Sequence, residues 1–528
     1  MSAAPRRSVP AMLAAAAARD ADALALHDGE RDLTYLQLEA EAGRFAAALV
    51  GRGVGRGDRV AIWCPNGAPW VIAALGVFSA GAVLVPVNTR FKGPEAAEVL
   101  RRSRARVLVT VTDFLGTDYV ALLEGARIPL PDLEQVVIAQ GPPAPGAEGW
   151  SEFTARATVE SVAEARARSA ALGPEDPSDI LFTSGTTGHP KGVVMTHGRT
   201  LAVASDWVAM TGLRTGDRYL MVNPYFHMFG LKAGILACVA SGATMLPEPV
   251  FDVDRVLARV AAERVTVLPG PPTLYQSILD HPRRGDYDLS SLRVAVTGAA
   301  EIPVTLIDRV RTELPFSLIV TGYGLTEAGT ASSTSEEDDA EAIATTVGRP
   351  RPGFEVRIVG EGGRDVGPGE SGEVLVRGPS VMAGYLDDPE ATARALSTAG
   401  WLSTGDLGTV DDGSRLRIVG RVKDMFIVGG FNAYPAEIEN ALLAHPSIQQ
   451  AAVIGVPDER LGEVGMAFVV VSGDVSAEAI IEWSREQMAN YKVPRVVELV
   501  EELPLNATGK VMKDALRAAV ARRSVATA

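Results

Sequence analysis

The stretch DILFTSGTTGHPKGVVMTH, residues 179–197, sets a loop of small polar residues between two apolar runs. Within it, residues 183–192 combine hydroxyl side chains and glycines with one lysine, Lys191. Glycines let a backbone turn its N–H groups inward, and hydroxyls with a cation complete a cradle for phosphate. A Walker A loop is excluded, because Pro190 stands where that motif needs its second glycine. The stretch predicts a strand, a phosphate-binding loop and then a strand or helix; a plain surface hairpin is the alternative.

Strand-like and helix-like patterns alternate over the larger part of the chain. RVAIWC at 59–64 and AVLVPV at 82–87 flank a helical stretch from Trp70 to Ser79, and the rhythm returns as far as LRVAVTGAA at 292–300. Such alternation indicates a layered α/β domain with largely parallel sheets. Short alternating strands then take over, which indicates a β-rich subdomain over about 350–420.

After Arg421 a new set of helices and strands begins, long enough for a separate α+β domain. We therefore expect an α/β fold in two parts. The first is a large N-terminal layered α/β domain over 1–420, which ends at a hinge at 421–424. The second is a small, mobile α+β C-terminal lid domain over 424–528.

Charge and composition exclude several classes of protein. The formal net charge of −15 argues against nucleic acid as a partner, because that binding depends on a basic surface. Cys64 and Cys238 have no metal or redox spacing, which fits a reducing compartment. The arginine pair in PRRSVP, residues 5–10, imitates an export signal, but Ser8 and Pro10 favour a first helix instead. No apolar run reaches the roughly 20 residues of a membrane span. We expect a cytoplasmic protein.

Four further motifs accompany the glycine-rich loop. They are YGLTEAG at 323–329, TGD at 404–406, GRVKD at 420–424 and NATGK at 506–510. In this order, and over nearly the whole chain, they resemble the adenylate-forming acyl-CoA synthetases, adenylation domains and luciferases. The resemblance implies ATP and Mg²⁺ as requirements, a carboxylic acid as substrate and CoA as co-substrate.

The resemblance also assigns the nucleotide site. The loop would hold the β- and γ-phosphates, Tyr323 would stack on adenine, Thr326 would bond the α-phosphate and Asp406 would bond the ribose. Arg421 would add a donor to the nucleotide. The complete expected set of ATP- and AMP-binding residues is Thr183, Ser184, Gly185, Thr186, Thr187, Gly188, Lys191, Gly298, Ala299, Ala300, Tyr323, Thr326, Asp406 and Arg421.

Three residues carry the expected chemistry of the first step together with Thr326. Lys510 would offset the charge that builds when a carboxylate attacks the α-phosphate. Glu327 would ligate Mg²⁺, which prefers carboxylate and phosphate oxygens. His227 would stand beside the substrate carboxylate. The alternatives are a mobile surface lysine, a carboxylate at a helix N-terminus and a histidine satisfied within the core.

The domain junction suggests a second step. Lys423 occupies the hinge position of the resemblance, and Gly429 with Gly430 would leave a passage for the pantetheine arm of CoA, although an ordinary turn also explains them. Few residues follow Lys510, so free CoA is expected as the acceptor rather than a tethered carrier domain. Lys232, among apolar neighbours, either extends to solvent or bonds a distal oxygen of the acid in the acyl pocket.

The identity of the acid is the least determined part of the predicted function. NPYFHMFGLKAGILAC at 223–238 and VTVLPGPPTLYQSILDHP at 265–282 resemble actinobacterial ligases that join CoA to the indanedione propionate left from steroid rings C and D. We therefore expect a cyclic keto acid or another ring or aromatic acid. Two alternatives stay open: an enzyme that passes its adenylate to an amine or nitrite, and a non-catalytic nucleotide-binding regulator. The sequence also leaves open whether two copies form a homodimer.

Overall fold

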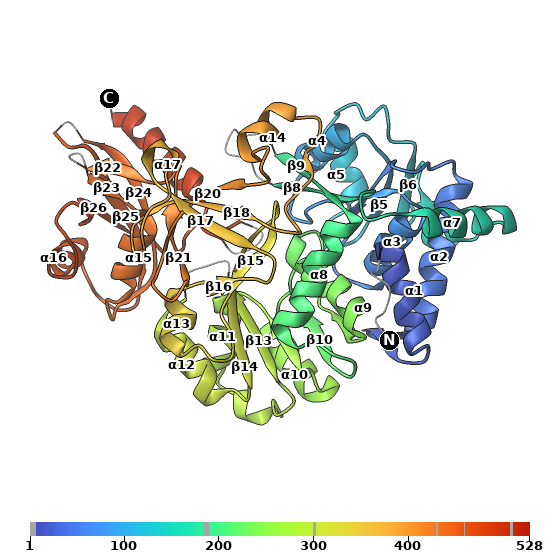
Figure 1. Cartoon of the computed structure of the whole chain (residues 1–528), viewed down its shortest axis with the longest axis horizontal. Helices are drawn as coiled ribbons and strands as arrows, with labels where there is room; N and C mark the ends of the chain where they lie inside the picture. Colours follow the sequence, from blue (N-terminus) through green and yellow to red (C-terminus); the bar gives the residue numbers. More distant parts are fainter. Residues whose placement is uncertain are drawn as a thin grey trace.

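The structure is a computed structural model that describes residues 7–183, 190–298, 302–428, 431–458, 460–506 and 510–527. These residues form four β-sheets with helices packed on them (Figure 1). Two large sheets belong to the N-terminal part, and a smaller antiparallel sheet follows them in the chain. The C-terminal part has a sheet of its own. No described helix is long and apolar enough to cross a bilayer.

The first large sheet is parallel at its centre and antiparallel at its edges. Parallel strands joined by helices bury both faces of a sheet, which explains why the central strands are almost wholly apolar. In sheet order its nine described strands are β16 (Arg349–Pro350), β15 (Gly329–Ser333), β14 (Leu318–Leu325), β13 (Val294–Gly298), β12 (Val267–Pro269), β10 (Arg218–Met221), β11 (Thr244–Pro247), β1 (Leu24–Asp28) and β2 (Arg31–Thr34).

The second large sheet carries the ends of the glycine-rich loop. Most of its strands are parallel, but β9 runs antiparallel to β8 and β19 runs antiparallel to β9. In sheet order its eight described strands are β19 (Gly384–Tyr385), β9 (Lys191–Thr196), β8 (Pro177–Thr183), β4 (Val83–Pro86), β3 (Arg59–Trp63), β5 (Ala105–Val111), β6 (Gln135–Gln140) and β7 (Glu148–Gly149).

Helices cover these two sheets. Ser8 caps α1 and a proline lies in its first turn, as the sequence predicts. Helix α3 is apolar on every side, so it is buried on every side. The helices of the N-terminal part are α1 (Val9–Arg19), α2 (Tyr35–Gly51), α3 (Ala68–Ser79), α4 (Gly93–Ser103), α5 (Tyr119–Gly125), α6 (Trp150–Thr154), α7 (Val159–Ala171), α8 (His197–Thr211), the π-helix η1 (Phe229–Leu236), α9 (Ala237–Ser241), α10 (Val253–Glu263), α11 (Pro272–Leu279), η2 (Arg284–Asp286), α12 (Val304–Glu313), α13 (Ala340–Thr345), η3 (Glu361–Gly363) and α14 (Pro389–Ala395).

The β-rich segment forms a meander in which every neighbouring pair of strands is antiparallel. Its strands are β17 (Glu355–Val359), β18 (Gly372–Arg377), β20 (Leu402–Val410) and β21 (Leu416–Arg421). It lies between the two large sheets and the C-terminal part in Figure 1. Its last strand ends at Arg421, where the expected hinge begins.

The C-terminal part packs three helices on its sheet, with apolar residues of α15, α16 and the sheet in one core. Its strands are β22 (Phe426–Val428), β23 (Phe431–Ala433), β24 (Ile448–Asp458), β25 (Gly462–Val471) and β26 (Val496–Leu499), and its helices are α15 (Pro435–Leu443), α16 (Ala477–Gln487) and α17 (Lys513–Thr527). The mixed α/β class, with a large first domain and a smaller second one, is therefore confirmed.

Candidate active site

The two ends of the glycine-rich loop face each other across a strand pair. Strand β8 ends at Thr183 and β9 begins at Lys191, and these two residues are partners in the antiparallel register. A strand therefore follows the loop, which settles the choice between strand and helix. Arg102 at the end of α4 donates a hydrogen bond to the carbonyl of Pro190. The remaining predicted phosphate ligands, Ser184 to Gly188, lie outside the described residues.

The predicted adenine and ribose residues come together from two sheets. The Tyr323 hydroxyl, at the end of β14, donates to Asp406 Oδ2 at 2.5 Å. Arg421 Nε lies 3.1 Å from Asp406 Oδ1, because Asp406 and Arg421 are register partners in β20 and β21. Gly298 is the partner of Gly322, directly before Tyr323, so the two expected adenine-lining segments are adjacent. Ala299 and Ala300 lie outside the described residues.

Thr326 and Glu327 occupy the tight turn that joins β14 to β15. The alternative interpretation of Glu327 as a carboxylate at a helix N-terminus is wrong, because the turn leads into a strand. Burial raises the pKa of Glu327 above its ordinary value. The Tyr385 hydroxyl opposes that effect by donating to Glu327 Oε1 at 3.1 Å.

Tyr385 was missed by the sequence analysis. It stands in strand β19, and the Lys191 ammonium lies over its ring, 4.9 Å from the ring centre. Its neighbours in the site come from distant parts of the chain, so no local pattern around Gly384 and Tyr385 signals the contact.

His227 lies in the loop before the π-helix η1. Phe229 N–H donates to His227 Nδ1 at 3.2 Å. Burial and the nearby charge of Lys510 lower the pKa of His227 to about 4, so the ring is neutral near pH 7. A neutral ring that accepts at Nδ1 carries its proton on Nε2, which leaves Nε2–H as a donor. Gly230 is required here, because a Cβ at that position would lie 2.2 Å from the Pro224 carbonyl oxygen.

Lys510 reaches this site from the C-terminal part. Its loop is closed by Asn506, whose N–H donates to the Lys510 carbonyl at 2.8 Å while its side-chain oxygen accepts from Lys510 N–H at 2.9 Å. Lys510 is an exposed residue. Partial desolvation by the surrounding protein and the charge of Arg421 nevertheless lower its pKa, whereas Asp406 opposes that shift. The lysine ammonium thus lies within electrostatic reach of His227, Arg421 and Asp406.

The predicted hinge residues are tied to the C-terminal helix. Lys423 Nζ lies 3.7 Å from Asp514 Oδ2, and Asp424 Oδ1 lies 2.7 Å from an Arg517 guanidinium nitrogen. Both partners belong to α17. The predicted passage residues, Gly429 and Gly430, lie outside the described residues.

One form of the prediction for Lys232 is wrong, and the other, a bond to a distal oxygen of the acid, stays a prediction. The side chain is fully buried, so it does not extend to solvent, and its Nζ lies 2.8 Å from Asp179 Oδ1. Asp179 also accepts from Ser178 and Thr200 hydroxyls at 2.6 and 2.7 Å. The ammonium therefore neutralises a buried carboxylate of strand β8, and it has no exposed surface in this structure.

Two family models match the chain. The description "AMP-binding enzyme" covers residues 13–386, and "AMP-binding enzyme C-terminal domain" covers residues 437–510. The chain belongs to the AMP-binding enzyme family. Tyr323, Glu327 and His227 lie in the first matched segment and Lys510 ends the second, whereas Asp406 and Arg421 lie between the two.

Similar proteins extend the comparison. A 3-[(3aS,4S,7aS)-7a-methyl-1,5-dioxo-octahydro-1H-inden-4-yl]propanoyl:CoA ligase of Rhodococcus jostii (strain RHA1) is 48% identical over 515 residues, 97% of this chain and 98% of its own. The ligase of the same name from Mycobacterium tuberculosis (strain ATCC 25618 / H37Rv) is 49% identical over 517 residues, with the same coverage. The crystal structure of the anthranilate CoA ligase AuaEII with anthranoyl-AMP superimposes with a TM-score of 0.87 at 30% identity, over 98% of both chains. The chain is an adenylate-forming acyl-CoA ligase, with ATP and CoA as substrates.

Proposed function

We propose that this adenylate-forming acyl-CoA ligase activates a bicyclic keto acid, the methyl-dioxo-octahydroindenyl propanoate that its two similar ligases are named for. The identity of 48% and 49% over almost the whole chain supports this acid. The observation that carries the chemistry is the placement of Lys510 beside His227, Asp406 and Arg421. That placement supports a role for the Lys510 cation at the point where a carboxylate and a triphosphate would meet.

In the first half-reaction the acid's carboxylate attacks the α-phosphorus of ATP, pyrophosphate leaves, and an acyl-adenylate forms. The Lys510 ammonium offsets the negative charge shared by the two reacting groups in the transition state. His227 contributes a hydrogen bond through Nε2–H rather than a charge, because its ring is neutral. Asp406 has two oxygens with spare lone pairs for the ribose hydroxyls, even while Tyr323 and Arg421 occupy one direction at each oxygen.

The residues present fit a magnesium ion. Glu327 is a largely enclosed carboxylate whose pKa is raised by burial, and a bound cation would offset that cost. Mg²⁺ commonly takes one or two protein carboxylates together with substrate phosphates. Glu327 would hold the ion, and the ion would neutralise phosphate charge when bound.

In the second half-reaction the thiol of CoA attacks the acyl carbonyl and AMP leaves. The hinge at 421–424 would let the C-terminal domain turn, taking Lys510 out of the site and admitting the thiol. Lys423 and Asp424 are held by α17. They would therefore turn with that domain.

An acid panel tests the proposed substrate. The enzyme is supplied with ATP, Mg²⁺ and CoA, and acyl-CoA and AMP are measured by mass spectrometry for the bicyclic keto acid, ferulate and unsubstituted medium- and long-chain acids. We expect kcat/KM for the keto acid to exceed that for each other acid by at least tenfold. Equal values across the panel would contradict the proposed acid. AMP release with no acyl-CoA would contradict CoA as the acceptor.

A further inference from the structure

One aromatic residue lies between two parts of the site that the chemistry requires. The Tyr385 hydroxyl donates to Glu327 Oε1 at 3.1 Å. Its ring faces the Lys191 ammonium, 4.9 Å from the ring centre. A single side chain thus contacts the glutamate of the turn and the lysine of the glycine-rich loop.

The strand register explains the contact with the lysine. Strand β19 adds to the edge of β9, with Tyr385 opposite Val193 and Gly384 opposite Val194. Side chains two residues apart on a strand share a face, so Lys191 lies on the same face as Val193. Tyr385 and Lys191 are therefore diagonal neighbours, a separation that aromatic and long side chains span. The sheet register therefore brings the two side chains within reach of each other.

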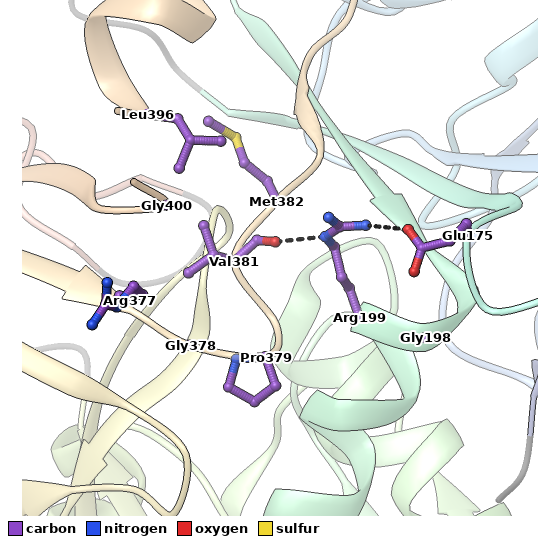
Figure 2. A pocket seen from close by; sticks show the side chains of 10 residues that line it. All are labelled: Glu175, Gly198, Arg199, Arg377, Gly378, Pro379, Val381, Met382, Leu396 and Gly400. Atoms are coloured by element: carbon purple, nitrogen blue, oxygen red, sulfur yellow. Dashed lines mark hydrogen bonds and ion pairs between the residues drawn. The ribbon is translucent and has the colours of Figure 1, made fainter. Parts of the chain in front are cut away.

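The backbone before Tyr385 is fixed from both sides. On the inner side Met382 N–H donates to the Glu327 carbonyl at 2.7 Å, and Ser380 Oγ donates to the Ala328 carbonyl at 2.7 Å. On the other side Arg199 Nε donates to the Val381 carbonyl at 2.8 Å (Figure 2). A cavity of about 310 Å³ borders this segment there, and Arg199 is held beside it by Glu175 at 3.2 Å. The first two bonds tie the segment to the Glu327 turn, and the Arg199 bond ties it to helix α8.

The chemistry of the two contacts differs. A phenol keeps its proton near neutral pH, so the Tyr385 hydroxyl acts as a donor to Glu327. A donor to one carboxylate oxygen fixes the orientation of the other oxygen. The ring face attracts a cation through its quadrupole, which restrains the ammonium without neutralising it.

We infer that Tyr385 is a positioning residue with two separable effects: its hydroxyl orients Glu327 toward a divalent cation, and its ring orients Lys191 toward phosphate. This inference rests on the proposed use of ATP with Mg²⁺. Tyr385 itself is not assigned a contact with substrate.

Nucleotide binding by the full-length enzyme tests the two effects without turnover. Isothermal calorimetry gives the ATP dissociation constant in EDTA and again with Mg²⁺, and the ratio measures the benefit of the cation. The proteins are wild type, Tyr385→Phe, Tyr385→Leu and, as a matched control for a lost hydroxyl, Tyr287→Phe. Melting temperatures are measured for all four.

Tyr385→Phe keeps the ring, so ATP affinity in EDTA should stay within twofold of wild type. The benefit of Mg²⁺ should fall by about tenfold, the lower end for a residue that orients a metal ligand. Tyr385→Leu should lose that benefit as well and also weaken ATP binding in EDTA by about fivefold, the scale of one cation–π contact. Tyr287→Phe should match wild type.

An unchanged Mg²⁺ benefit in Tyr385→Phe would overturn the role of the hydroxyl. Unchanged binding in EDTA by Tyr385→Leu would overturn the role of the ring. Equal losses in both variants, in step with their melting temperatures, would reduce Tyr385 to a structural residue. A wild-type protein that binds no ATP would instead contradict the proposed function, and the inference with it.

Discussion

The buried pair of Lys232 and Asp179 gives the most quantitative prediction. Neither side chain has any exposed surface. Their ion pair joins the π-helix η1 to strand β8, which leads into the glycine-rich loop. Lys232→Met keeps the length of the side chain and removes its charge. Asp179 would then remain in the interior with only the Ser178 and Thr200 hydroxyls as partners.

The cost of that change follows from the free energy of protonating the carboxylate. An isolated buried carboxylate takes up a proton when that is cheaper than staying charged. For a free aspartic acid in water, with a pKa near 3.9, protonation costs about 1.4 kcal/mol for each pH unit above that value. The loss of stability should therefore be about 4 kcal/mol at pH 7 and about 1.5 kcal/mol at pH 5. The value at pH 7 agrees with the roughly 3–5 kcal/mol found when buried pairs lose one partner.

Asp179→Asn should show the opposite dependence on pH. Lys232 is then buried without its carboxylate and loses its proton, which costs about 4.5 kcal/mol at pH 7 but about 2 kcal/mol at pH 9, since a free lysine has a pKa near 10.4. In Lys232→Met, Asp179 gains a proton on folding, so this variant becomes less stable as pH rises. A proton lost on folding makes Asp179→Asn more stable as pH rises. The double variant removes both charges and should melt close to wild type with neither slope.

Melting temperatures from pH 5 to pH 9 measure these slopes relative to wild type. At about 2 °C per kcal/mol, Lys232→Met should melt about 8 °C lower at pH 7. Arg394→Met, which breaks an exposed pair with Glu390, is the control and should change little. Slopes of the same sign in the two single variants would refute the ion-pair account. Acid selectivity should not change through direct contact, because Lys232 faces no open space.

Further predictions concern the lysine, the histidine and the hinge. Lys510→Met should reduce ATP–pyrophosphate exchange by about a hundredfold or more but still convert a supplied acyl-adenylate to thioester; loss of both steps in a folded variant contradicts the role. The same variant should raise the pKa of His227 from about 4, followed by ¹⁵N NMR, because one of its two causes is gone. The pKa of His227 in the folded protein lies below the pKa of roughly 6.5 of an unfolded histidine. The stability that neutral His227 contributes is therefore complete above about pH 6.5 and is lost as pH falls toward 4. His227→Asn should flatten this part of the plot of melting temperature against pH. Lys423→Pro should stop thioester formation and retain exchange, whereas Lys423→Ala should retain both.

The sequence predicts the parts of this enzyme that short motifs encode. Alternating strands and helices give the layered α/β class, and the motifs around Tyr323, Asp406 and Lys510 give a nucleotide site before any coordinates. These motifs lie far apart in the chain, and the sheet order brings them together. The roles assigned to the individual site residues remain predictions, and several of the residues lie outside the described chain.

Buried polar pairs are what the sequence does not reveal. Lys232 reads as an anomaly among apolar neighbours because its partner, Asp179, precedes it by a helix and two strands. The acidic run at 335–342 has the composition of a solvated loop, yet Asp338 is buried against Arg349 and Arg415, and Asp339 caps helix α13. Charge type is local information, whereas burial depends on packing across the fold.

Helix α17 has a mechanical consequence. Its Asp514 and Arg517 hold the last two residues of the expected hinge, Lys423 and Asp424, and the helix begins just beyond the Lys510 loop. If the proposed hinge turns at the backbone near Arg421 and Val422, these contacts would make the turn, the helix and the lysine move as one rigid unit. A small rotation there would then move the Lys510 ammonium by a larger distance without breaking the contacts of α17. Shortening the chain within α17 should therefore reduce acid activation, because Lys510 would lose its support.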